Sequence, residues 1–72
     1  MKKIKKIKIR VNGKVNSIIE KTSLLKLLND LKIPLKKVAI ELNQQIIDKK
    51  KLKRIYLKAD DKVEIVHFIG GG

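Results

Sequence analysis

The sequence predicts an α+β fold in which a mixed sheet of four to five strands packs on one main helix. Three observations support this prediction. Residues 6–11 alternate between basic and apolar side chains, which is typical of a half-buried strand. Leucines recur at helical spacing over residues 24–31, and a strongly apolar run occupies residues 63–69.

The first two elements form a predicted β-hairpin. The apolar side chains of its first strand share one face: Ile7, Ile9 and Val11. Asn12 and Gly13 follow at once, and this pair is preferred in the type I′ turn that joins two antiparallel strands. The return strand is predicted over residues 14–19.

The next segment has the period of an amphipathic helix. Its apolar stripe consists of Leu24, Leu27, Leu28 and Leu31. Thr22 or Ser23 is expected to cap the helix by accepting a backbone N–H bond. Pro34 disfavours helical geometry at the residue before it, so the helix is expected to end near residue 31 or 32. A helix of about three turns is marginal alone, and we expect its stripe to pack against the hairpin.

Shorter elements follow the helix. Residues 38–42 predict a third strand, and residues 43–45 a polar turn into the apolar pair Ile46-Ile47. The lysine-rich stretch after Asp48 is interpreted as a loop or a single helical turn. Residues 55–57 predict a short edge strand, and residues 58–62 a turn.

Residues 63–69 predict the last strand. If Val63 and Ile65 face the helix, alternation turns Val66 or Phe68 outward. The element order fits the β-grasp arrangement, in which the last strand pairs in parallel beside the first. We expect residues 1–69 to form a single β-grasp domain and residues 70–72 to form a flexible functional tail.

The end of the sequence carries the functional pattern. Three of the four glycines are the last three residues: Gly70, Gly71 and Gly72. Glycine loses more conformational entropy on ordering than any other residue, so stability does not explain them. A strip without Cβ atoms can thread a narrow channel in a partner and present a terminal carbonyl to attack. A frayed terminus is the alternative interpretation.

The composition excludes several kinds of chemistry. The sequence has no Cys and one His, which excludes disulfides and thiol nucleophiles and leaves too few ligands for a typical zinc site. No nucleophile, base and orienting group occur at plausible spacing, so we expect no catalytic residues and no bound metal. His67 is expected to be a strand surface residue. Neither a signal peptide nor a membrane span is predicted, so we expect a cytoplasmic protein without a membrane partner.

The formal net charge is +12, concentrated at residues 2–14 and 49–54. This charge suits an acidic partner such as nucleic acid, or reflects the codon usage of an AT-rich genome. A basic nucleic-acid-binding β-grasp module would need aromatics for stacking, and Tyr56 and Phe68 are the only candidates. Nucleic acid is therefore not the expected partner.

Two segments resemble the ThiS family of sulfur carriers in bacterial thiamine biosynthesis: residues 61–72, DKVEIVHFIGGG, and residues 38–47, VAIELNQQII. The resemblance covers essentially the whole chain in length and element order. The terminal motif is its specific part, because every ubiquitin-like β-grasp protein has the hairpin and helix. The high lysine content departs from the mild charge expected for such carriers.

The resemblance implies a carrier that is not itself an enzyme and binds no cofactor. An E1-like, ThiF-like adenylyltransferase would use ATP to adenylate the carboxylate of Gly72. Sulfur from a persulfide, made by a cysteine desulfurase, would then leave a thiocarboxylate there. A ThiG-like thiazole synthase would use that sulfur for the thiazole of thiamine. Gly70 and Gly71 would form the slender approach to the reacting carbonyl, and we expect the isolated chain to be monomeric.

Partner contacts are predicted for Val66, Phe68 and Ile69, since aromatic residues are enriched in binding hot spots. Alternatively, Phe68 completes the core. Two related functions stay open. A molybdopterin synthase small subunit is a similar carrier, although its tail usually has prolines before the glycines. A ubiquitin-like modifier would form an isopeptide bond instead.

Overall fold

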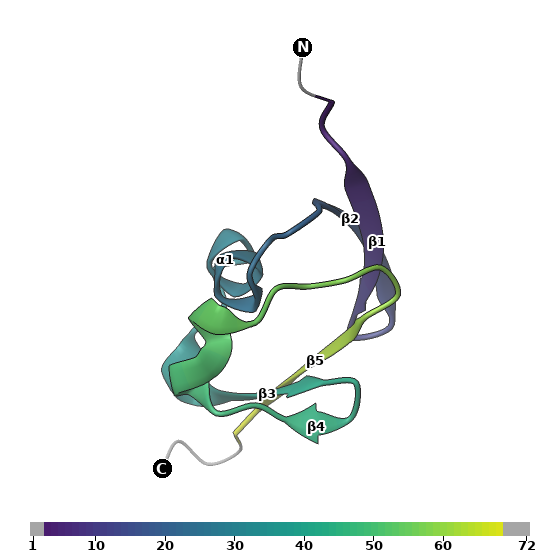
Figure 1. Ribbon diagram of the computed structural model, residues 1–72. Coiled ribbons are helices and arrows are strands. Elements are labelled where there is room, and N and C mark those ends of the chain that lie inside the picture. Colours follow the sequence, from purple (N-terminus) through teal and green to yellow (C-terminus); the bar gives the residue numbers. More distant parts are fainter. Residues whose placement is uncertain (1–2, 69–72) are drawn as a thin grey trace.

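The computed structural model describes residues 3–68 and has the predicted α+β architecture (Figure 1). A five-stranded mixed sheet has the strand order β2-β1-β5-β3-β4. Its strands are β1 (Lys6–Val11), β2 (Lys14–Ile19), β3 (Val38–Leu42), β4 (Gln45–Ile46) and β5 (Lys62–His67). The helix α1 (Leu24–Asp30) and the short 3₁₀ helices η1 (Leu35–Lys37) and η2 (Lys49–Arg54) complete the described elements.

The last strand pairs in parallel with the first, which confirms the β-grasp topology. Residue Arg10 lies opposite Lys62, and Val11 lies opposite Val63. The amide of Arg10 donates to the carbonyl of Asp61, and the amide of Asn12 donates to the carbonyl of Val63, both at 2.9 Å. On its other side β5 pairs antiparallel with β3, so β5 lies in the middle of the sheet (Figure 1).

The predicted hairpin is confirmed. Strands β1 and β2 pair antiparallel from Lys6 opposite Ile19 to Val11 opposite Lys14. Asn12 and Gly13 have φ angles of 48° and 82°. Both therefore lie in the left-handed region that a type I′ turn requires, where asparagine and glycine are tolerated.

Helix α1 is capped as predicted at its start but is shorter than predicted. The Oγ of Ser23 accepts the amide of Lys26 at 3.0 Å. At the other end Lys32 has a φ of 58°, and the amide of Ile33 donates to the carbonyl of Leu28 at 3.0 Å. This left-handed residue ends the helix at Asp30, ahead of the restriction imposed by Pro34, and leaves about two turns.

The core lies between one face of the sheet and the layer formed by α1 and η2. Its buried side chains are Ile9, Leu24, Leu27, Leu28, Val38, Ile40, Leu52, Leu57, Val63 and Ile65. The fourth leucine of the predicted stripe, Leu31, is 40% exposed. It follows the last helical residue as the C-cap and lines a surface hollow with Val11 and Lys14, so it lies near the hairpin, as expected for the stripe, but is not buried.

The prediction of an edge strand at residues 55–57 was wrong. This segment makes an isolated bridge between Tyr56 and Ser23, at the start of α1. The amide of Leu57 donates to the carbonyl of Thr22 at 2.9 Å. Because Leu52 and Leu57 are buried, the lysine-rich stretch forms η2 and the chain after it follows the helix rather than the sheet.

Candidate functional site

The glycines Gly70, Gly71 and Gly72, together with Ile69, lie outside the residues that the structure describes. Within residues 3–68, the candidate site consists of the C-terminal end of β5 and Phe68, which follows it. No helix within residues 3–68 combines the length and the apolar character needed to cross a membrane. The same residues contain no group of three or more His, Cys, Asp or Glu side chains placed to hold a metal ion.

Strand β5 is held along its full length by β3. Pairing runs from Val63 opposite Leu42 to His67 opposite Val38. Beyond the strand, the amide of Phe68 donates to the carbonyl of Lys37 at 2.9 Å. The chain is therefore hydrogen-bonded to the sheet up to the residue that immediately precedes Ile69 and the three glycines.

On the other side of β5, the side chain of Asn12 continues the sheet where β1 ends. The amide of Ile65 donates to Asn12 Oδ1 at 2.7 Å, and Asn12 Nδ2 donates to the carbonyl of Ile65 at 3.3 Å. The side-chain amide of Asn12 thus makes the two hydrogen bonds to β5 that a further backbone residue of β1 would make in parallel pairing. The sequence indicated Asn12 only as a turn residue, because its partner is 53 positions away.

Replacing Asn12 with alanine should lower the free energy of unfolding by about 2–3 kcal/mol, since both bonds are lost and alanine tolerates the positive φ poorly. Glycine at this position is compatible with the turn and loses only the two hydrogen bonds to Ile65. The free energy of unfolding of this variant should therefore fall by about 1–2 kcal/mol. Urea denaturation followed by circular dichroism measures both. An Asn12→Gly variant as stable as the wild type would show that the bonds to Ile65 contribute nothing.

Two apolar side chains are exposed at this end of β5. Val63 and Ile65 are buried, whereas Val66 is 46% exposed and Phe68 is 57% exposed. Phe68 therefore lies on the surface and does not complete the core. Lys49 Nζ lies 5.4 Å from the centroid of its ring, a distance typical of a cation–π contact that orients the aromatic side chain.

His67 is exposed, as expected for a strand surface residue. It lies opposite Val38 on β3, with the apolar side chains Val66 and Phe68 as its chain neighbours. The roles predicted for Val66 and Phe68 in partner binding remain predictions, and their exposure is compatible with those roles.

Comparison with known proteins identifies the family of this chain. The model of the ThiS family matches residues 9–72. The crystal structure of thiamine biosynthesis protein ThiS from Geobacter metallireducens superimposes with a TM-score of 0.81 at 30% identity, covering 92% of this chain and all of that one.

Two sequence relatives differ in length. A protein of Porphyra purpurea described only as uncharacterized protein ycf40 is 37% identical over 68 residues, which cover 94% of this chain and 96% of that protein. A thiazole synthase of Magnetococcus marinus is 38% identical over 66 residues, and this chain spans only 20% of its length. From the family match and the shared ubiquitin-like β-grasp fold, this chain belongs to the ThiS family.

Proposed function

We propose that this chain is a sulfur carrier for thiazole formation in thiamine biosynthesis and that the carboxylate of Gly72 is its reacting group. The observation that carries the proposal is the match to the ThiS family through residue 72, on a fold that fixes β5 up to Phe68. Four residues follow Phe68, and an extended chain of that length spans at most about 14 Å. The glycines therefore suit a carboxylate that reacts inside a partner at some distance from the folded body.

The chemistry needs an activated carboxylate, because a carboxylate is a poor electrophile. Attack of the Gly72 carboxylate on the α-phosphate of ATP forms an acyl-adenylate and releases pyrophosphate. The terminal sulfur of a persulfide then attacks the carbonyl carbon, and AMP leaves. A second thiol cleaves the S–S bond and forms a disulfide with the former persulfide cysteine, which leaves the sulfur on Gly72 as a thiocarboxylate.

In this proposal the chain supplies the reacting group, and its partners supply the catalysis. The sequence has no Cys, so the persulfide and the second thiol come from outside these 72 residues. A ThiF-like adenylyltransferase would use the ATP, a cysteine desulfurase would make the persulfide, and a ThiG-like thiazole synthase would accept the sulfur. The thiazole synthase relative supports this last partner, since one of its segments is similar to 92% of this chain.

The proposal is tested by the intact mass of the protein after incubation with a ThiF-type adenylyltransferase, ATP, a cysteine desulfurase and cysteine. The expected result is an exchange of one oxygen for sulfur that maps to Gly72. The adenylyltransferase is first shown to modify a ThiS protein of its own organism. If that enzyme then leaves this chain unchanged, the carrier assignment is wrong.

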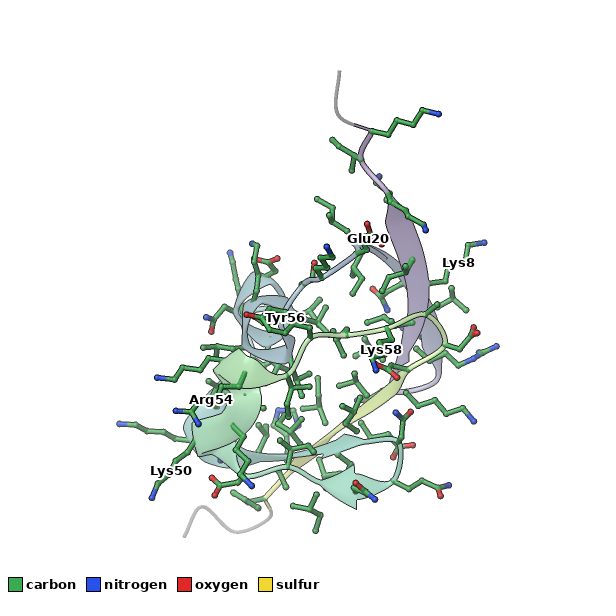
Figure 2. The ribbon with its side chains drawn as sticks, in the orientation of Figure 1. Lys8, Glu20, Lys50, Arg54, Tyr56 and Lys58 are labelled. Atoms are coloured by element: carbon green, nitrogen blue, oxygen red, sulfur yellow. The ribbon has the colours of Figure 1, made fainter. Side chains whose placement is uncertain are left out.

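We further propose that Val66, Phe68 and Ile69 bind the adenylyltransferase, with Phe68 as the main anchor. The Phe68→Ala variant should raise KM for the carrier about 30-fold in an ATP–pyrophosphate exchange assay, as loss of a hot-spot aromatic does. Tyr56→Ala is the matched control, because Tyr56 is 60% exposed and lies beside the start of α1 (Figure 2). Equal effects of the two substitutions would argue against a specific anchor at Phe68.

A further inference from the structure

The face of the sheet turned away from α1 carries exposed apolar side chains next to the C-terminal end of β5. Val66 lies directly opposite Ala39 on β3, and Phe68 follows on the same face by strand alternation. Ile46 on β4 is 77% exposed and lies opposite Glu41. We refer to the side chains of Ala39, Ile46, Val66 and Phe68 as the outer strip.

Two carboxylates adjoin the outer strip and face one another. Glu41 on β3 lies directly opposite Glu64 on β5 in the antiparallel register. Side chains in such positions have Cβ atoms about 4.5–5.5 Å apart, and like charges placed there destabilise the sheet. The free domain therefore bears a like-charged pair beside the outer strip, and the exposed Lys62 precedes Glu64 on the same face.

An opposed pair of carboxylates is unusual in a chain whose formal net charge is +12. The sequence has 19 Lys and Arg and only seven Asp and Glu, and two of these seven are the opposed Glu41 and Glu64. Over residues 3–68, the one ion pair within 4.0 Å joins Lys26 and Asp30, both within α1. Neither Glu41 nor Glu64 thus has a described lysine or arginine nitrogen within 4.0 Å, although basic residues are abundant.

We propose that the opposed carboxylates of Glu41 and Glu64 receive an arginine of the adenylyltransferase, while the outer strip packs against apolar side chains around that arginine. This inference rests on the proposed function and adds the chemistry of the partner surface. A guanidinium is planar and has five donors, so one arginine can bond to two carboxylates at once. Binding would replace a repulsion in the free domain with two charge-assisted hydrogen bonds.

The overall charge makes this site selective. A positively charged partner group is repelled by most of a surface with a net charge of +12. The Glu41–Glu64 pair is a local exception, so the arginine has one favourable position on this face. Such complementarity determines the register of docking, and that register in turn aligns the tail with the active site of the partner.

The test uses Glu41→Gln, Glu64→Gln and the double variant of the full chain. Each single substitution removes the repulsion and should raise Tm by about 1–5 °C. In ATP–pyrophosphate exchange with the ThiF-type enzyme, each should also raise KM for the carrier about three- to tenfold and leave kcat unchanged. The double variant should gain little further stability over either single variant, because the repulsion is already gone.

The matched control is Glu20→Gln, which removes the same charge. Glu20 follows β2 and lies well away from the C-terminal end of β5 in the view of Figure 2. Its substitution should leave KM within twofold of the wild type, which separates local recognition from the change in net charge. A purely structural role for the pair would not raise Tm and KM together.

Two results would overturn the inference while leaving the carrier function intact. One is an adenylated wild type whose KM does not change in the glutamine variants. The other is a fall in Tm in those variants, which would show that the carboxylates do not repel in the free domain. If the wild type itself is not adenylated by an enzyme active on its own carrier, the proposed function fails, and this inference fails with it.

Discussion

Deleting Gly72, or adding one alanine after it, should abolish thiocarboxylate formation. Deletion shortens the reach of the carboxylate by about 3.5 Å, and extension moves it as far in the other direction and adds a Cβ atom. Reacting groups misplaced by about 1 Å already lose large factors in rate, so either change should reduce sulfur incorporation at least 100-fold. Intact mass spectrometry after incubation with ATP and the sulfur-transfer enzymes measures the loss.

The fold should be unaffected by these changes, because the buried core side chains among residues 3–68 all lie between Ile9 and Ile65. Tm therefore serves as the internal check that only the chemistry is lost. Adding one residue at the N-terminus is the matched control for a change in length. An extended chain that acquires sulfur without being trimmed would show that Gly72 is not the reacting residue.

Replacing Leu28 with alanine should have the largest effect on stability. Leu28 is 0% exposed and lies in the core layer between α1 and the sheet. Truncation of a buried leucine costs about 2–5 kcal/mol, whereas a chain of 72 residues has roughly 4–11 kcal/mol in total. We expect the variant to be at or near the limit of folding, as measured by urea denaturation followed by circular dichroism.

Leu31→Ala is the matched control on the same leucine stripe. Leu31 is 40% exposed and follows the last helical residue, so its truncation should cost less than about 1 kcal/mol. Equal losses in the two variants would mean that Leu31 contributes to the core after all and that its exposure has little energetic meaning.

The sequence alone determined the features that depend on local conformational preferences. Alternation over residues 6–11 and the pair Asn12-Gly13 predicted the hairpin, because strand period and positive φ are properties of neighbouring residues. Helical spacing and Ser23 likewise predicted α1 and its cap. The terminal glycines predicted a function that the match to the ThiS family supports.

Tertiary structure decided which of these side chains meet. The bonds between Asn12 and Ile65, and the opposed pair Glu41 and Glu64, join positions far apart in the sequence, and no local pattern encodes the register that aligns them. The exposure of Phe68 depended on where the core ends along β5. The segment around Tyr56 followed α1 because burial of its leucine neighbours outweighed its tendency to extend the sheet edge. The conformational preferences of neighbouring residues decide where helices and strands form. Packing decides which of them come into contact, because burial depends on the whole chain.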